Sequence, residues 1–238
     1  MIHAPQEGDG EPSRGVRVEP LGDRALTVRL GDSVDEATRR RVQATYARLA
    51  ERAVPGVVEL VPAFASVTVH YEPAGVPRAP GSAASPYARL RALLDDALAG
   101  VADASPPPAA SVEIPVRYGG DDGPDLDDVA RRHAMSPDEV VRLHTAGDYV
   151  VHMLGFLPGF PYLGGLDPRL ATPRRDVPRT VVPAGSVGIG GAQTGVYSID
   201  SPGGWHLIGR TALRLFDAGR DPPTLLRAGD RVRFRSVG

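Results

Sequence analysis

The chain has 238 residues, of which 42% are hydrophobic and 24% charged, with a net charge of −2, as in globular proteins of one or two domains. It contains no cysteine, which excludes a disulfide framework, a thiol nucleophile and a cysteine-ligated metal. Lysine is also absent, so all 27 basic residues are arginine, which excludes a lysine Schiff base, a biotin attachment site and a Walker A nucleotide loop.

The charge and hydropathy of the chain also argue against several partners. A net charge of −2 gives no global electrostatic attraction to nucleic acid. No apolar run approaches the roughly 20 residues that span a membrane. The first 15 residues are polar and rich in glycine and proline, so we expect a disordered tail and no secretory signal. We therefore expect a cytoplasmic protein that binds neither nucleic acid nor membranes.

The strongest domain boundary is the run of alanine and proline at 102–110. Such a run cannot pack into a core and is typical of a semi-rigid linker. It separates an N-terminal domain at 16–101 from a C-terminal domain at 111–238, and both lengths are ordinary for single domains.

The N-terminal domain has an α+β pattern. Alternating apolar and polar residues predict strands at 26–30 and 67–71. Ser33 with Glu36 predicts a capping box at the start of one helix, and Ser85 followed by proline predicts the start of another. The residues expected on the inward helix faces are Val42, Tyr46, Leu49, Ala53, Tyr87, Leu90, Leu94 and Leu98. This order fits two helices on one face of a small antiparallel sheet.

The C-terminal domain begins with a strand at 112–117 and continues with two short helices that start near Asp125 and Ser136. From residue 149 onward the pattern is that of short strands separated by glycine and proline. Such a succession is typical of a barrel or a sandwich. The expected strands are 149–155, 180–182, 187–189, 196–199, 205–208, 213–216 and 231–235.

A rigid loop at 155–162 leaves the first of these strands. Its Phe160 and Tyr162 offer flat apolar faces on a backbone that has little entropy to lose. One hypothesis is an aromatic-lined binding surface. The alternative is a structural corner of the barrel whose aromatic side chains close one end, and spacing alone favours neither.

A basic stretch follows, with Arg169, Arg174, Arg175 and Arg179. Guanidinium groups bind carboxylates and phosphates through two hydrogen bonds at once. Interspersed aspartates dilute the charge, so spacing alone slightly favours a solvated loop over a binding site.

The glycine-rich segment at 183–195 is not a dinucleotide fingerprint, because its glycine spacing differs and a strand follows it. Its backbone N–H groups could form an anion-binding nest. A hairpin turn is at least as good an interpretation. Gln193 and Thr194 are its candidate polar contacts.

The histidines form no recognisable catalytic or metal motif. His133 and His144 are too far apart on their helices for paired metal ligands, so no metal site is predicted. His152 is expected to be a packed core residue, and His206 is expected near the rim of the arginine-containing loop. The catalytic base remains unassigned from the sequence.

Short motifs run through the whole C-terminal domain, and the combination is specific. They occupy 118–120, 123–126, 154–163, 183–187, 193–195, 201–205, 208–211 and 229–232, with weaker N-terminal matches at 20–23 and 57–71. With these motifs the chain resembles the KipI / allophanate hydrolase subunit 1 family, whose bacterial members include the B-type subunit of 5-oxoprolinase. The polar N-terminal extension is not part of the pattern.

The resemblance implies a small α+β domain followed by a cyclophilin-like β-barrel. It implies one partner of the KipA or allophanate hydrolase subunit 2 type, which is the C-type subunit of the complex, and a further partner, the A-type subunit. The complex converts 5-oxo-L-proline, a cyclic amide, to L-glutamate with ATP, and we expect the partners to bind most of the nucleotide. The alternatives are a histidine-kinase inhibitor without catalysis and a carboxyltransferase-like subunit of a urea- or amide-processing complex.

The family motifs also imply which loops contact substrate or partner, without naming a catalytic residue. The candidate binding residues are Phe156, Pro158, Gly159, Phe160, Tyr162, Arg174, Arg179, Gly185, Gln193, Thr194, Ser201, Trp205 and Arg210.

Overall fold

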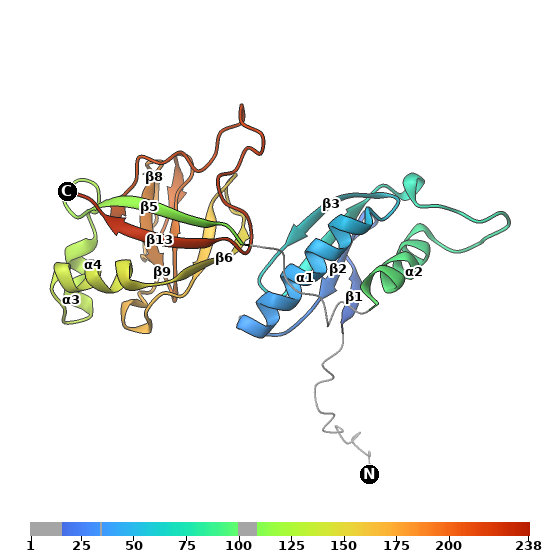
Figure 1. The fold of residues 1–238 in the computed structure, drawn as a ribbon, viewed down its shortest axis with the longest axis horizontal. Helices are drawn as coiled ribbons and strands as arrows, with labels where there is room; N and C mark the ends of the chain where they lie inside the picture. The colour runs from blue at the N-terminus through green and yellow to red at the C-terminus, as the bar shows by residue number, and fades with distance from the viewer. Residues whose placement is uncertain (1–15, 34, 100–108) are drawn as a thin grey trace, which may run out of the picture. The chain divides into compact units, whose positions relative to one another are not determined.

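The structure is a computed structural model that describes residues 16–33, 35–99 and 109–238. The chain divides into two compact units, residues 1–104 and 105–238. Both units combine helices with a β-sheet (Figure 1). The second unit closes its sheet into a barrel, so the α+β fold class with a C-terminal barrel is confirmed.

The expected tail at 1–15 lies outside the described residues, and so does the expected linker at 102–110 as far as residue 108. The last linker residue is bound to the second unit. The N–H of Ala110 donates to Oδ1 of Asp230 (3.0 Å), and the carbonyl of Ala110 accepts from the N–H of Arg231 (2.8 Å).

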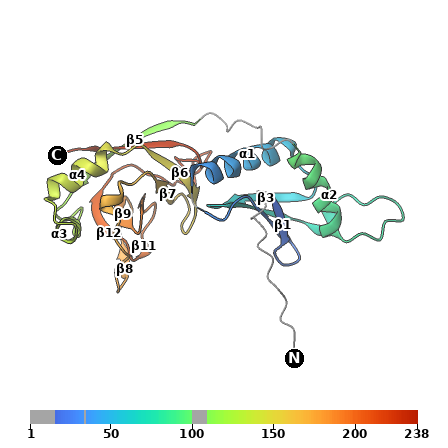
Figure 2. The same ribbon diagram turned by 90° about the horizontal axis from the view of Figure 1, so that it is seen from below.

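The N-terminal unit is a sheet packed against helices. Over 16–33 and 35–99, its elements are β1 (Arg17–Pro20), β2 (Ala25–Arg29), α1 (Glu36–Arg52), β3 (Val57–Pro62), β4 (Ser66–Tyr71), the 3-10 helix η1 (Pro73–Gly75) and α2 (Pro86–Leu98). The strands pair antiparallel in the order β1-β2-β4-β3. Figures 1 and 2 show α1 lying along one face of this sheet. Val67 and Val69 of β4 share a buried core with Leu90 and Leu94 of α2.

The start of α1 differs from the predicted capping box. Asp35 is the cap, and its Oδ1 accepts from the N–H of Thr38 (2.7 Å). Ser33 instead donates its hydroxyl hydrogen to the carboxylate of Asp35. A carboxylate is favoured here because it also faces the positive end of the helix dipole.

The predicted inward face of α1 is partly right. Val42 and Leu49 are buried. Tyr46 is 37% exposed, and Ala53 lies beyond the helix in the left-handed region (φ 43°). Smaller residues such as Ala44 are also buried, beside Val42. The buried face of α1 therefore differs from the face predicted from its large apolar side chains alone.

The C-terminal unit is a closed barrel with two helices and a separate ribbon. Over 109–238, its elements are β5 (Ser111–Tyr118), α3 (Leu126–Arg132), α4 (Pro137–Ala146), β6 (Tyr149–Leu154), β7 (Pro161–Gly164), η3 (Pro168–Leu170), β8 (Arg179–Val182), β9 (Ser186–Gly190), β10 (Gln193–Val196), β11 (Ser201–Gly203), β12 (His206–Arg210) and β13 (Arg231–Ser236). The barrel order is β10-β7-β6-β13-β5-β12-β9, closed from β9 to β10. Strands β8 and β11 pair outside it.

One expected strand of this unit is wrong, one is misplaced, and two observed strands have no expected counterpart. The segment 213–216 is a loop, and the strand expected at 196–199 is β10, which lies three residues earlier at Gln193–Val196. β7 and β11 are short and contain proline or glycine, which hides them from an alternation pattern. β7 forms because β6 and β10 supply hydrogen-bonding partners on its two sides.

The helices α3 and α4 lie side by side at one end of the barrel, near the end of β13 (Figure 1). Val140 and Leu143 of α4 enter the barrel core with Ile114 of β5 and Phe234 of β13. The helices therefore cover that end of the barrel.

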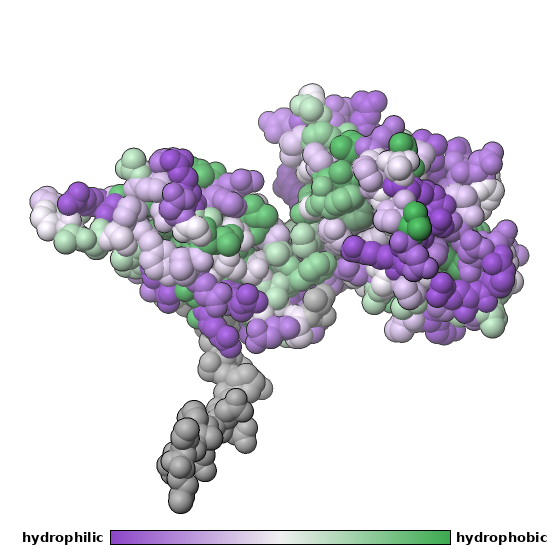
Figure 3. Space-filling model, turned by 180° about the vertical axis from the view of Figure 1, so that it is seen from behind, coloured by the Kyte–Doolittle hydropathy of each residue, from purple (hydrophilic) through white to green (hydrophobic). Residues whose placement is uncertain are grey.

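The visible face of each unit is mostly hydrophilic, with apolar residues in limited patches (Figure 3). In the described part of the chain, every helix is too short or too polar to cross a membrane.

Candidate functional site

An aromatic cluster lies beside the barrel core and is separate from it. Phe160 is at its centre, with ring centroids 5.0 Å from Tyr162, 5.3 Å from Tyr197 and 5.5 Å from Trp205. All these rings meet edge to face, the arrangement that aromatic quadrupoles favour. Phe160, Tyr197 and Trp205 are buried, and Tyr162 is half-buried. The cluster is therefore a rigid support for whatever binds against it.

The indole of Trp205 packs against glycines of the β9–β10 hairpin, which leave space for the ring because they have no side chain. A Cβ on Gly190 would lie 2.5 Å from the Trp205 ring, and one on Gly188 or Gly195 would lie 3.1 Å from Trp205. The glycine-rich segment is thus a hairpin, one of its two interpretations, with Gly191 at the turn in the left-handed region (φ 64°). Its glycines leave room for an aromatic ring.

The cluster lines a cavity of about 310 Å³, which we call the aromatic groove. Its lining is largely apolar, and its titratable side chains are one arginine and two tyrosines. The lining residues are Phe156, Leu157, Phe160, Tyr162, Arg174, Pro178, Tyr197, Pro202, Gly203, Gly204 and Trp205. An apolar cavity with a few polar groups at its edge is the usual form of a small-molecule site.

Phe156 stands at the edge of the groove in an unusual conformation. Its side chain is 62% exposed, and its backbone lies in the left-handed region (φ 68°). That region is costly for a bulky residue. The ring lies 5.8 Å from the ring of Phe160, so an exposed aromatic face extends the groove outward.

The loop before β8 brings Arg174 to the groove, and a buried carboxylate holds that loop. Asp125, at the start of α3, accepts from Arg175 Nη1 (3.0 Å) and from both terminal nitrogens of Arg179 (2.7 and 2.9 Å). Its Oδ2 also accepts from the N–H of Leu207 (2.7 Å). Arg174 itself is exposed.

The surroundings of Asp125 favour its charged form. Burial raises the pKa of this carboxyl, but the hydrogen bonds from Arg179 and Leu207 and the charges of Arg179 and Arg175 outweigh that effect. The net result is a pKa below the ordinary value. Asp125 is therefore ionised at neutral pH and suited to anchor two guanidinium groups.

The arginines of the predicted basic stretch therefore have different roles. Arg174 lines the groove, whereas Arg175 and Arg179 are bound to Asp125. Sequence reasoning identified Asp125 only as the start of a helix. Its partners lie 50 and 54 residues away along the chain, a separation that no local pattern reveals.

Thr194 points away from the groove, to a buried histidine of α4. Its Oγ1 donates to the carbonyl of Gly188 (2.9 Å) and lies 2.9 Å from Nε2 of His144. That oxygen must therefore accept from Nε2–H, so Nδ1 of His144 accepts from the hydroxyl of Tyr118 (2.8 Å). Burial lowers the pKa of His144 to about 3, so the imidazole is neutral and structural.

The other histidines play lesser parts. His152 is half-buried, so its expected place in the core is wrong, because Val151 takes the inward position of β6. His206 is buried, with Nε2 3.1 Å from the carbonyl of Pro173. Burial lowers the pKa of His206. Neither residue lines the aromatic groove.

The remaining candidates do not line the groove, and two of them line a second cavity. Pro158 accepts from the hydroxyl of Ser198 (2.6 Å) through its carbonyl, and Gly159 turns the loop with φ 75°. The hydroxyl of Ser201 is buried without a hydrogen bond. The other predicted residues are Gln193, half-buried at the start of β10, and Gly185 and Arg210, which line the second cavity.

No group of three or more histidine or carboxylate side chains that could hold a metal ion occurs among residues 16–33, 35–99 and 109–238. The groove itself offers aromatic faces, main-chain groups, two tyrosine hydroxyls and one guanidinium. Groups of these kinds can orient a small ligand and attract an anion.

Comparison with known proteins gives a consistent result. Residues 16–226 match the family described as carboxyltransferase domain, subdomain C and D. The chain is 48% identical over 219 residues to a Bacillus subtilis (strain 168) protein that is named as the B-type subunit of 5-oxoprolinase. The match covers 92% of this chain and 91% of that protein.

Solved structures agree on the fold. The crystal structure of TTHA0988 has a TM-score of 0.76 at 39% identity, covering 90% of this chain and 40% of that chain. The K. lactis urea amidolyase has a TM-score of 0.70 at 22% identity, covering 96% of this chain and 15% of that chain. The same two-unit fold thus also occurs as a segment of much longer chains.

Proposed function

We propose a function from one premise: this chain belongs to the family of the carboxyltransferase domain, subdomain C and D, in agreement with its resemblance to KipI / allophanate hydrolase subunit 1. The function is that of the B-type subunit of a 5-oxoprolinase. The complex would convert 5-oxo-L-proline, ATP and water to L-glutamate, ADP and phosphate. The similarity to the B. subtilis protein of that name, over 91% of its length, carries the proposal.

The aromatic groove suits such a substrate. 5-Oxoproline is a small flat lactam that carries one carboxylate. Its ring faces would pack against the accessible rings of Phe156 and Tyr162, and its carboxylate would meet the guanidinium of Arg174. A cavity of about 310 Å³ is at the lower end of the range for small-molecule sites, as expected for a ligand of this size.

The composition of the groove also supports a partner. Opening a lactam needs a group that activates water and groups that stabilise the developing charge. The titratable groups that line the groove are Arg174, Tyr162 and Tyr197, and burial raises the pKa of Tyr197. A general base is therefore expected from a partner of the KipA or allophanate hydrolase subunit 2 type, which would complete the pocket.

The test is reconstitution. We expect this chain, mixed with homologues of the A-type and C-type subunits, to support ATP-dependent release of glutamate from 5-oxoproline. We expect no release by the chain alone. Equal release when this chain is left out of the mixture, or full activity of the chain by itself, would contradict the proposal.

A further inference from the structure

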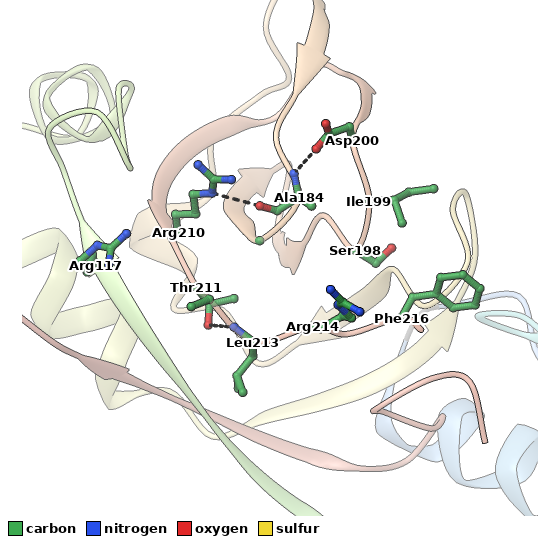
Figure 4. A pocket seen from close by; sticks show the side chains of 12 residues that line it. Arg117, Ala184, Ser198, Ile199, Asp200, Arg210, Thr211, Leu213, Arg214 and Phe216 are labelled. Carbon is green, nitrogen blue, oxygen red and sulfur yellow. Dashed lines mark hydrogen bonds between the residues drawn. The ribbon is translucent and has the colours of Figure 1, made fainter. Parts of the chain in front are cut away.

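A second cavity, of about 750 Å³, lies in the C-terminal unit and shares no lining residue with the aromatic groove. Figure 4 shows Arg117 and Arg210 on one side of this cavity, and Ile199 and Phe216 on the opposite side, with Arg214 between them. The cavity therefore has two guanidinium groups on one side and, on the other side, two large apolar side chains close to Arg214. Nothing in the proposed reaction of the groove uses it.

The side with the two guanidinium groups contains an unfavourable pairing. Arg117 of β5 and Arg210 of β12 are register partners on neighbouring antiparallel strands. Both are exposed, and both line the cavity. Like charges directly opposite each other destabilise a sheet. Asp122 interacts with both arginines and relieves part of that cost. An anion bound beside Arg210 would relieve more of it.

The carboxylates nearby neutralise only part of this charge. Arg117 pairs with Asp122 (2.7 Å), and the charge of Arg210 also lowers the pKa of Asp122. Arg214 pairs with Asp217 (3.1 Å). Arg210 donates from Nε to the carbonyl of Ala184 (3.0 Å), and no carboxylate of the described residues lies within 4.0 Å of its guanidinium. Asp200, the acidic residue of the lining, accepts from the N–H of Ala184 (2.7 Å). The terminal nitrogens of Arg210 are thus left for a ligand.

The backbone beside Arg210 is fixed by close contacts. Gly185 lies in the left-handed region (φ 84°), and a Cβ there would lie 2.1 Å from the carbonyl oxygen of Thr211. The N–H of Gly185 donates to the carbonyl of Tyr197 (2.7 Å), and the N–H of Thr211 donates to the carbonyl of Gly185 (2.9 Å). The loop that precedes β9 and the end of β12 are therefore held together, which positions Arg210 before any ligand arrives.

We propose that this cavity binds a nucleoside di- or triphosphate. Guanidinium groups bind phosphate oxygens through two hydrogen bonds at once, so Arg117, Arg210 and Arg214 would hold the phosphates. The base would pack against Phe216 and Ile199 on the opposite side. This site goes beyond the function proposed for the groove, and it gives the chain a nucleotide site of its own where we expected the partners to bind most of the ATP.

Isothermal titration calorimetry on the purified full chain tests the inference without the other components of the complex. ATP and ADP are expected to bind, and adenosine to bind much more weakly. Arg210→Gln should lower the affinity for ATP at least about tenfold, because a charged hydrogen-bonding partner is lost. Phe216→Leu should lower the affinity for ATP and leave that for inorganic tripolyphosphate unchanged.

Arg233→Gln is the matched control. Arg233 is an exposed arginine of β13, paired with Asp148 and outside the cavity, so this variant should bind ATP like the wild type. Thermal melting confirms that each variant is folded. The inference is overturned if the wild-type chain does not bind ATP at millimolar concentration, or if Arg210→Gln and Arg233→Gln bind it equally. It is also overturned if Phe216→Leu weakens ATP and tripolyphosphate alike. A failure here leaves the reconstitution assay unaffected.

Discussion

The carboxylate of Asp125 and the guanidinium of Arg179 form a two-point ion pair, with distances of 2.9 Å from Nη1 to Oδ2 and 2.7 Å from Nη2 to Oδ1. The pair joins the start of α3 to the start of β8 across 54 residues of chain. Together with Arg175, it fixes the loop that places Arg174 at the aromatic groove. The edge of the groove is thus set by a buried charge in another part of the unit.

Asp125→Asn should therefore loosen this loop. The change removes the charge that two arginines face and weakens the bond to the Leu207 N–H. Breaking a buried pair costs several kcal/mol when the remaining charge stays dry. The side chains of Arg175 and Arg179 are 31% and 25% exposed, so water compensates in part. We expect a loss of about 2 kcal/mol in the free energy of unfolding, measured by urea denaturation.

Asp167→Asn is the control for that variant. Asp167 also pairs with an arginine of the same unit, Arg169, but the side chain of Asp167 is 25% exposed, whereas that of Asp125 is 3% exposed. A surface pair contributes little to stability. Equal destabilisation by the two variants would show that Asp125 has no special anchoring role.

Gly190→Ala should disturb the aromatic cluster selectively. The added methyl group would lie 2.5 Å from the indole of Trp205, so the ring has to move. Overpacking of this kind costs about 1–3 kcal/mol. Trp205 is the single tryptophan of the chain, so its emission spectrum reports directly on the groove. We expect a shifted emission maximum and a lower melting temperature.

Gly219→Ala provides the comparison. A Cβ on Gly219 would lie 3.5 Å from Asp217 Oδ1, an ordinary contact. Its emission spectrum and melting temperature should match those of the wild type. An unchanged spectrum in Gly190→Ala would mean that Trp205 does not depend on the bare backbone of β9.

The parts of the fold and site that could be predicted from the sequence are those that depend on residues close together in the chain. The start of α2 was predicted correctly, because Ser85 and Pro86 carry a local signal, and Ser85 Oγ accepts from the Ala88 N–H (3.1 Å) as expected of a cap. The strand that became β12 was placed nearly correctly, and its apolar residues Leu207 and Ile208 are buried. These features depend on neighbours in the sequence.

The wrong and missing predictions depend on which segments meet in the fold. The segment 213–216 alternates like a strand, yet it forms one isolated bridge, from Phe216 to Thr224, and a hydrogen bond from the N–H of Leu225 to the carbonyl of Leu215 (2.8 Å). The family motifs predict Phe160 and Trp205 as candidate binding residues, but they do not predict that the two ring centroids lie 5.5 Å apart. Asp125 is missing from the predicted site, because nothing beside it in the sequence shows that two arginines converge on it.

Unfolding as a function of pH should show the effect of His144. Its ordinary pKa is 6.5, and burial lowers it to about 3 in the folded chain. As the pH falls below 6.5, the unfolded chain takes up a proton that the folded chain excludes. Above pH 6.5 this difference in proton uptake does not affect stability. Between pH 6.5 and about pH 3 it lowers the free energy of unfolding by about 1.4 kcal/mol per pH unit.

His144→Gln removes this titration while keeping an N–H donor for Thr194. The variant loses the acceptor for the hydroxyl of Tyr118, so it should be less stable than the wild type at pH 7. Between pH 6.5 and pH 4, its free energy of unfolding should fall less steeply than that of the wild type. Parallel curves would show that His144 is protonated in the folded chain as readily as in water.

The most direct measurement is the initial rate of glutamate release against 5-oxoproline concentration, for complexes that contain wild-type, Arg174→Gln or Arg169→Gln chains. Arg174 lines the groove, whereas Arg169 pairs with Asp167 outside it. If the groove holds the carboxylate of the substrate, Arg174→Gln raises KM about tenfold and Arg169→Gln leaves it unchanged. The same KM in all three complexes would contradict a substrate site in the aromatic groove.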